Sequence, residues 1–393
     1  MRNPLSKTIE QIKPSGIRKF FDIVSEMPHA ISLGVGEPDF DTPWHVRSEG
    51  IRSLEKGRTF YTSNSGLIEL RQEICKWYQR KYNVLYDYKT EALLTVGGSE
   101  GIDVALRAML DPGDEVIIPE PCYVSYVPCV QLIGAVPVTI ELKNENQFRL
   151  TPEELLAAIT DKTKILILAF PSNPTGAVMT KEDLEPIAKI CQEKDIYVIS
   201  DEIYSELTYG GQKHCSISSL PGMKERTIVI NGFSKAYAMT GWRLGYALAP
   251  EVIAHQMTKI HQFAIMCAPT TSQYAGVSAL KNGDEDVAHM RDEYNGRRRY
   301  LMHRFKEMGL ECFEPFGAFY AFPCIKEFGM TSDEFATRFL QEEKVAVVPG
   351  TAFGACGEGF LRISYAYSLE ALKEALDRME RFVQKLRAEK KEA

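Results

Sequence analysis

Polar and glycine-rich residues follow four short apolar runs of the sequence, and their side-chain types are those that bind a phosphate and move protons. The run LLTV is followed by 97–99, ILILAF by 171–176, IYVIS by 201–204 and TIVIN by 232–235. In open α/β sheets, ligands bind beyond the carboxyl ends of the strands. We therefore expect these segments to meet in one crevice, which a purely structural protein has no need to build.

Each segment taken alone has a plain structural interpretation as well as a chemical one. Gly97-Gly98-Ser99 before a helix offers free backbone N–H groups to a phosphate, but glycine turns before helices are common. Asp201 after an apolar strand is either a helix N-cap or a buried carboxylate that needs a partner. Lys235 would by default be a solvated lysine, yet glycine, serine and aromatic residues surround it in the sequence. The combination favours a catalytic site.

The elements that must position these residues alternate between strand and helix from residue 45 to about residue 285. This alternation predicts an α/β domain with a mostly parallel sheet. Thr151 and Thr180 are expected as helix N-caps, the first with Pro152 and Glu154 in a capping-box pattern. Helices are expected at 41–54, 67–82, 100–110 and 181–194.

After residue 285 the pattern changes to one of helices that enclose short strands, which predicts a smaller α+β domain. The helices are expected at 287–308, 332–343 and 369–386. The N-terminal arm, residues 1–44 with a short helix around 16–27, is assigned to the same lobe because chain ends often meet. The predicted domains are therefore 1–44 with part of the small domain, 45–285 and 286–393.

Composition excludes several other classes of protein. The 393 residues suit about two domains, and a net charge of −7 argues against nucleic-acid binding. The nine cysteines include no C-x-x-C pair, so neither a zinc site nor thioredoxin-like chemistry is expected. With no apolar leader and no long apolar run, we expect a cytoplasmic protein with no metal and no membrane contact.

The run GFSKAYAMTGWRLG closely resembles the pyridoxal-phosphate attachment motif of class I aminotransferases, which have fold type I. Ser234, Lys235, Arg243 and Gly245 fall where that family has them. Four further segments resemble family motifs in the same order, namely LGVGEPDFDTP, PSNPTG, SDEIYSEL and LRISYA. The resemblance covers essentially the whole chain. It implies a large domain with a mostly parallel seven-stranded sheet and a smaller α+β domain.

For the cofactor, the resemblance implies that Lys235 anchors pyridoxal 5'-phosphate covalently and moves the substrate proton. Asp201 would pair with the ring nitrogen, while Tyr204 and Asn173 would hydrogen-bond the phenolic oxygen of the ring. Tyr123 would stack on the ring face. The phosphate would be held by Gly98, Ser99, Glu100, Ser234 and Arg243.

The resemblance also implies a homodimer with shared active sites, in which Tyr61 reaches the cofactor phosphate of the other subunit. Arg362 would grip the α-carboxylate of the substrate with its planar guanidinium, supported by Gly36 and Asn173. A cis peptide bond is expected before Pro174.

These roles imply a ping-pong aminotransferase that moves an amino group between an L-amino acid and a 2-oxo acid, with 2-oxoglutarate expected as the common acceptor. Many aspartate-specific relatives carry a lysine at the position of Ser99, whereas Ile17, Phe40 and Tyr320 could form an apolar pocket here. These features favour a broad, aromatic or other large amino acid as donor, but the sequence alone does not separate aspartate, aromatic and broad specificity. A β-lyase that cleaves C–S bonds and a non-catalytic regulatory protein are the alternatives, and the β-lyase would release pyruvate.

Overall fold

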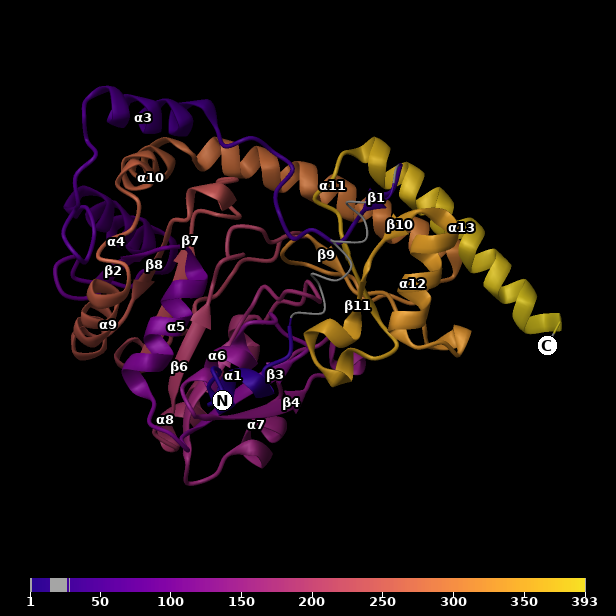
Figure 1. The fold of residues 1–393 in the computed structure, drawn as a ribbon, viewed down its shortest axis with the longest axis horizontal. Coiled ribbons are helices and arrows are strands. Elements are labelled where there is room, and N and C mark those ends of the chain that lie inside the picture. Colours follow the sequence, from indigo (N-terminus) through magenta and orange to yellow (C-terminus); the bar gives the residue numbers. More distant parts are fainter. Residues whose placement is uncertain (1, 15–26, 28, 393) are drawn as a thin grey trace.

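The computed structural model describes residues 2–14, 27 and 29–392, and Figure 1 shows a sheet-centred region beside a second region formed by the C-terminal part of the chain. The helix expected around 16–27 lies outside the described residues, apart from Met27.

A seven-stranded sheet forms the centre of the first region, called the sheet region below. Its order is β2-β8-β7-β6-β5-β3-β4, and only β8 runs antiparallel to its neighbours. This confirms the predicted mostly parallel α/β fold. The strands are β2 Ala92–Thr95, β3 Glu115–Glu120, β4 Val136–Glu141, β5 Thr163–Leu168, β6 Tyr197–Asp201, β7 Thr227–Gly232 and β8 Gly245–Leu248.

The middle strands are buried because helices cover both faces of the sheet. Every residue of β7 is buried, as are the last four residues of β5 and of β6, and continuous apolar runs are typical of strands covered on both sides. The helices of this region are α3 Trp44–Glu55, α4 Ile68–Tyr82, α5 Gly98–Met109, α6 Tyr126–Leu132, α7 Pro152–Ala158, α8 Lys181–Glu193, α9 Glu251–Ala264 and α10 Thr270–Asn282. A short helix, α1 Lys7–Gln11, precedes them.

Local capping signals mark several helix starts. Thr151 and Thr180 both form complete capping boxes, with Glu154 and Asp183 as the reciprocal partners, so both predicted caps are confirmed. Helix α5 begins at Gly98, two residues before the predicted start, because Gly97 adopts a φ of 77° that ends the preceding loop.

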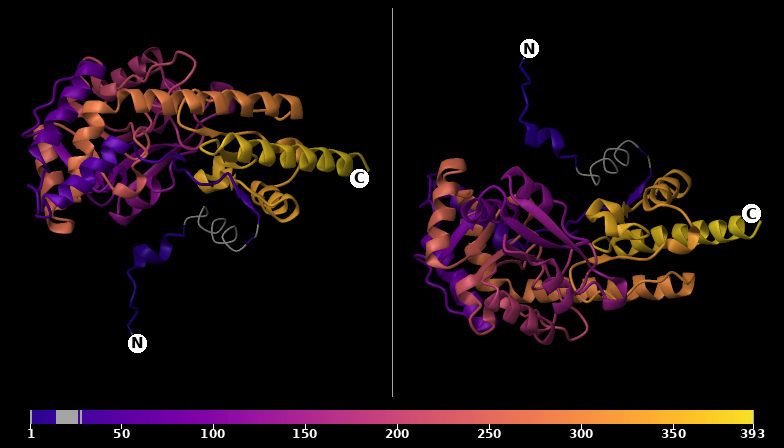
Figure 2. Two further views of the ribbon diagram at one scale, coloured as in Figure 1. Left: turned by 90° about the horizontal axis from the view of Figure 1, so that it is seen from above. Right: turned by 90° about the horizontal axis from the view of Figure 1, so that it is seen from below.

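The second region, called the C-terminal region below, consists of α11 Asp284–Met308, α12 Ser332–Glu343, α13 Leu369–Glu392 and short strands. The strands β9 Tyr320–Ala321, β11 Val348–Pro349 and β12 Leu361–Ser364 form an antiparallel sheet in the order β11-β12-β9. Figure 2 shows α11 and α13 side by side as they extend away from the central sheet.

The N-terminal arm joins the C-terminal region through a parallel pair formed by β1 Ile31–Ser32 and β10 Val345–Ala346. The domain limits 1–44, 45–285 and 286–393 remain our proposal, and α11 begins two residues before the last limit.

Within the described part of the chain, no helix is long and apolar enough to cross a membrane. The same residues contain no cluster of three or more His, Cys, Asp or Glu side chains arranged to hold a metal ion. All nine cysteines are free thiols.

Candidate active site

A cavity of about 400 Å³ lies where the carboxyl ends of the central strands meet the C-terminal region. The start of α5, which follows β2, contributes Gly98 and Ser99 to its wall, and the loops after β3 and β5 contribute Tyr123 and Asn173. The segments at the ends of β6 and β7 contribute Asp201, Tyr204, Ser234, Lys235 and Arg243. Gly36 and Arg362 close the cavity from the arm and from β12. The structure thus brings together most of the residues singled out in the sequence.

Two of the residues expected to bind the cofactor, Glu100 and Tyr61, lie outside the cavity wall. The carboxylate of Glu100 turns away, accepting a hydrogen bond from the Val96 backbone N–H at 2.5 Å and contacting Nδ1 of His261 at 2.5 Å. Its backbone N–H still belongs to the first turn of α5. Tyr61 is 80% exposed and lines a separate surface hollow with Phe60.

Lys235 follows β7 and places its amine in the cavity, where Nζ donates to the Gly36 carbonyl oxygen at 2.6 Å. Burial lowers the pKa of this amine from 10.5 to about 8, since removal from water disfavours the charged form. Glu37 opposes this effect, while Arg362 and Arg243 add to it. The amine therefore loses its proton far more readily than a surface lysine.

Asp201 ends β6 and presents a buried carboxylate to the same cavity. It accepts hydrogen bonds from the Tyr126 hydroxyl at 2.7 Å and from the Ile203 backbone N–H at 3.2 Å. Burial raises the pKa of Asp201, and these two hydrogen bonds together with Lys235 oppose the rise. A cationic N–H group in the cavity would favour the ionised form of this carboxylate.

Arg362 is a buried guanidinium whose hydrogen-bond partners are neutral oxygens. Nη1 donates to Oδ1 of Asn173 at 2.9 Å and Nη2 donates to the Gly34 carbonyl, while Nε is buried without a partner. The guanidinium lies between the rings of Tyr320 and Phe353, at 4.6 and 4.7 Å from their centroids. Burial lowers its pKa. A buried cation in such a setting is costly unless an anion joins it, so the geometry favours binding of a carboxylate ligand.

An anion-binding cradle lies at the start of α5. A Cβ on Gly245 would come within 2.6 Å of the Gly97 carbonyl carbon and 2.7 Å of the Gly98 nitrogen, so the two backbones approach as only glycine allows. Arg243, in the left-handed conformation at φ 51°, lies against Gly97. Free N–H groups at a helix N-terminus beside a guanidinium suit a phosphate group.

Comparison with known proteins agrees with this geometry. The family model described as "Aminotransferase class I and II" matches residues 28–379. The chain belongs to this family of aminotransferases.

Three relatives illustrate the match. The aspartate aminotransferase of Pyrococcus abyssi is 48% identical over 96% of this chain and 97% of that protein. The aromatic-amino-acid aminotransferase 2 of Thermococcus litoralis is 46% identical over 96% of this chain and 97% of that protein. The crystal structure of the aromatic aminotransferase from Pyrococcus horikoshii matches with a TM-score of 0.89 and 46% identity, over 94% of this chain and 99% of that chain.

The protein is thus an aminotransferase with fold type I, as expected from its motifs, and its family is one of pyridoxal-phosphate-dependent enzymes. The cis peptide bond expected between Asn173 and Pro174 is present. Several residues that line this cavity were not singled out from the sequence, among them the polar side chains of Tyr126, Glu37 and Thr240. Tyr126 lies three residues after Tyr123 in the sequence, and only its hydrogen bond to Asp201 distinguishes it from a core aromatic.

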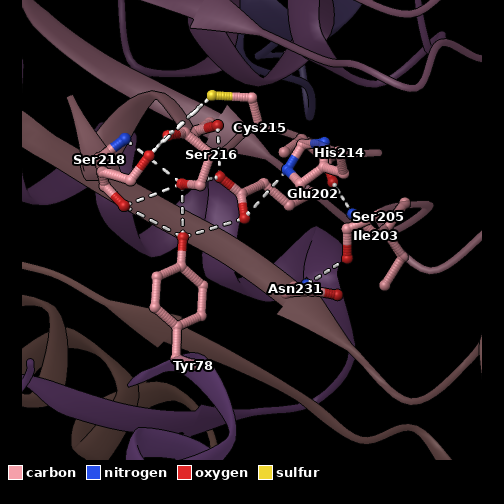
Figure 3. A network of polar contacts seen from close by, with 12 residues as sticks. Tyr78, Glu202, Ile203, Ser205, His214, Cys215, Ser216, Ser218 and Asn231 are labelled. Carbon is pink, nitrogen blue, oxygen red and sulfur yellow. Dashed lines mark hydrogen bonds and ion pairs between the residues drawn. The ribbon is translucent and has the colours of Figure 1, made fainter. Parts of the chain in front are cut away.

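Directly after Asp201, the fully buried Glu202 lies in a polar network of this aminotransferase (Figure 3). Its carboxylate accepts hydrogen bonds from the hydroxyls of Tyr78 at 3.0 Å, Ser216 at 2.5 Å and Ser200 at 3.0 Å. Nε2 of His214 lies 3.4 Å from the same carboxylate. Since Glu202 adjoins Asp201, the network holds the end of β6 against α4 and against the loop that carries Ser216.

Replacing Glu202 by alanine should destabilise the aminotransferase, because three buried hydroxyls lose one acceptor and a buried polar group left without a partner costs about 1–3 kcal/mol. Glu202→Gln keeps the shape and one acceptor oxygen, so its loss should be smaller. Ser218→Ala is the matched control, since Ser218 contacts Tyr78 and Ser216 but not Glu202. The midpoint of urea unfolding ranks the stabilities of the variants. An alanine variant as stable as the glutamine variant would contradict the prediction.

Proposed function

We propose that this aminotransferase binds pyridoxal 5'-phosphate in the cavity and transfers an amino group between an L-amino acid and a 2-oxo acid by a ping-pong mechanism. The observation that carries the proposal is that the Asp201 carboxylate, at the end of β6, and the Lys235 amine, after the adjacent strand β7, line one cavity. When bound, the cofactor supplies an aldehyde that bonds to amines and a ring that withdraws electrons.

The phosphate group fits the cradle at the start of α5. The backbone N–H groups of Gly98, Ser99 and Glu100 belong to the first turn of that helix and would donate to the phosphate oxygens. The hydroxyls of Ser99 and Ser234 and the guanidinium of Arg243 would add side-chain donors. The close approach of Gly245 to this turn keeps the helix start where these groups converge.

The ring fits between the remaining residues of the cavity. Asp201 would hold the proton on the ring nitrogen, and burial strengthens that attraction because little water competes. Oδ1 of Asn173 already accepts from Arg362, which leaves its amide nitrogen to donate to the phenolic oxygen together with the Tyr204 hydroxyl. Tyr123 would cover one face of the ring.

Lys235 is the group that would move the substrate proton. With a pKa lowered to about 8 by burial, its amine is neutral in a useful fraction of molecules near neutral pH. A neutral amine can take the proton from the substrate Cα, and the resulting ammonium can return it, which is general acid–base catalysis by a positioned group.

Arg362 would bind the α-carboxylate that all amino-acid and 2-oxo-acid substrates share. Its unpartnered Nε and its neutral partners leave its charge available to a ligand. Gly36 lies beside it, and a Cβ there would fall within 2.4 Å of the Tyr320 hydroxyl oxygen, so the bare backbone at this position would support the carboxylate.

For the substrate side chain we propose aspartate, an aromatic amino acid or a broad set as donor, with 2-oxoglutarate as acceptor. Both specificities occur in the names of relatives that are 46–48% identical. Of the apolar wall expected from the sequence, Tyr320 lines the cavity, Phe40 packs instead against Tyr294 and His289, and Ile17 lies outside the described residues.

A homodimer with shared active sites completes the proposal. Phe60 and Tyr61 are each 80% exposed and line the same surface hollow, and exposed aromatic neighbours are typical of protein interfaces. Tyr61 would contact the phosphate in the cavity of the other subunit. The expected cytoplasmic location stays a prediction.

Lys235→Ala should abolish the conversion of the bound cofactor that single amino acids cause in the absence of an oxo-acid acceptor. The conversion is followed by absorbance. In the unchanged protein, the amino acid that reacts fastest identifies the donor class. In the unchanged apoprotein, cofactor uptake should accelerate as the pH rises and level off above about 8, because the amine is then neutral. With a lysine of ordinary pKa, the rate of cofactor uptake would keep rising until about pH 10.4. Pyruvate release without conversion would instead indicate a β-lyase.

Arg362→Ala should raise KM for every amino acid alike, since the α-carboxylate is common to all of them. Loss of one partner of a buried charge pair costs about 2–5 kcal/mol, so the expected rise is on the order of 100-fold. Arg362→Lys keeps the charge but not the planar fork, so its KM should lie between that of the unchanged protein and that of Arg362→Ala. An effect confined to one substrate would place Arg362 at a side-chain pocket.

Sedimentation of the purified protein should give the mass of a dimer. Tyr61→Phe should leave that mass unchanged and weaken retention of the cofactor severalfold, because one hydroxyl contact to the phosphate is lost. A monomer with full activity would contradict both the assembly and the role of Tyr61.

A further inference from the structure

The Tyr320 side chain lies where three parts of the cavity meet. Its hydroxyl is 2.7 Å from the hydroxyl of Tyr204, and its ring lies against the guanidinium of Arg362 with a centroid distance of 4.6 Å. The backbone of Gly36 contacts the same hydroxyl closely. Tyr320 is fully buried, so its hydroxyl has these neighbours rather than bulk water for hydrogen bonding.

Backbone hydrogen bonds hold this arrangement on both sides. Tyr320 belongs to β9, which pairs with the strand of Arg362 through Ser364. The segment that follows Tyr204 pairs with the chain before β9, where the Ala318 N–H donates to the Leu207 carbonyl at 2.9 Å. The two hydroxyls are therefore fixed by strand pairing as well as by their own contact.

The number of protons available determines which of the two hydroxyls donates to the other. Each phenol has one proton, so if Tyr204 donates to Tyr320, it has none left for a ligand in the cavity. Burial raises the pKa of both phenols, but the pKa of Tyr204 rises well above its usual value, whereas at Tyr320 the Arg362 guanidinium is the main influence that opposes the rise. Tyr320 is therefore the stronger acid and the better donor of the two.

We propose that Tyr320 is a positioning residue for amino-group transfer: its hydroxyl donates to the Tyr204 oxygen and thereby directs the Tyr204 proton toward the phenolic oxygen of the cofactor ring. The inference rests on the proposed function. It gives Tyr320 a role beyond that of an apolar wall for the substrate side chain, because the hydroxyl rather than the ring orients the Tyr204 proton.

Tyr320→Phe tests the proposal, and Tyr365→Phe is its matched control. Tyr365 is equally buried in the same core, and its hydroxyl donates to the Ala318 carbonyl at 3.2 Å without lining the cavity. Both variants thus lose one buried phenolic hydroxyl. The measurements are the pH midpoint of the absorbance change of the bound cofactor, then kcat and KM for one amino-acid donor.

The Tyr320→Phe variant should move the midpoint upward by up to about one pH unit and lower kcat by up to about tenfold, the effect of one hydrogen bond, with KM little changed. The midpoint rises because a weaker donor at Tyr204 stabilises the anionic ring oxygen less. Tyr365→Phe should leave both quantities at their original values. The double variant Tyr204→Phe with Tyr320→Phe should match Tyr204→Phe alone, because the effect passes through Tyr204.

An unchanged midpoint in Tyr320→Phe, or additive shifts in the double variant, would overturn the proposal. If Tyr320→Phe fails to fold, fluorinated tyrosine at position 320 replaces it. The more acidic hydroxyl should then lower the midpoint, and a midpoint that stays or rises would overturn the proposal as well. Failure of the proposed function is recognised separately, since the unchanged protein would then show either no cofactor absorbance or pyruvate release without conversion of the cofactor.

Discussion

Burial of ionisable groups at one edge of the central sheet is the constraint that the rest of the structure serves. The adjacent strands β6 and β7 deliver a carboxylate, Asp201, and an amine, Lys235, into a single cavity. Burial pushes the pKa of Asp201 up and that of Lys235 down, so both groups are held away from their charged forms. A folded chain pays for such a site with stability, which is acceptable only where a ligand or a reaction uses it.

The surroundings of these groups are built to limit that cost. Tyr126 and the Ile203 N–H donate hydrogen bonds to Asp201. Three hydroxyls donate to the carboxylate of the next residue, Glu202. Glycine at position 245 lets the start of α5 approach β8 at backbone distance. The sheet therefore supplies a rigid frame, and the polar contacts between its strand ends and neighbouring helices fix the cavity wall.

The C-terminal region adds the groups that meet a substrate. The antiparallel strands β9 and β12 carry Tyr320 and Arg362, and both reach the cavity between the two regions. The N-terminal arm takes part through β1, which pairs with β10, and through Gly36. Residues from both ends of the chain thus line the same cavity as residues from the middle of the sequence.

The sequence by itself determined the local features of this protein: buried strands from continuous apolar runs, helix starts from Thr151 and Thr180, and the family from five ordered motifs. These are readable because strand burial, capping and motif spacing involve neighbours in the chain. Only the tertiary structure decided the contacts of Tyr126 with Asp201, Tyr320 with Tyr204 and Tyr78 with Glu202, whose partners are 75, 116 and 124 residues apart. It also showed that Glu100 turns toward His261 and that Tyr61 faces outward. Such contacts depend on how strands and helices pack, and packing leaves no pattern between distant residues in a single sequence.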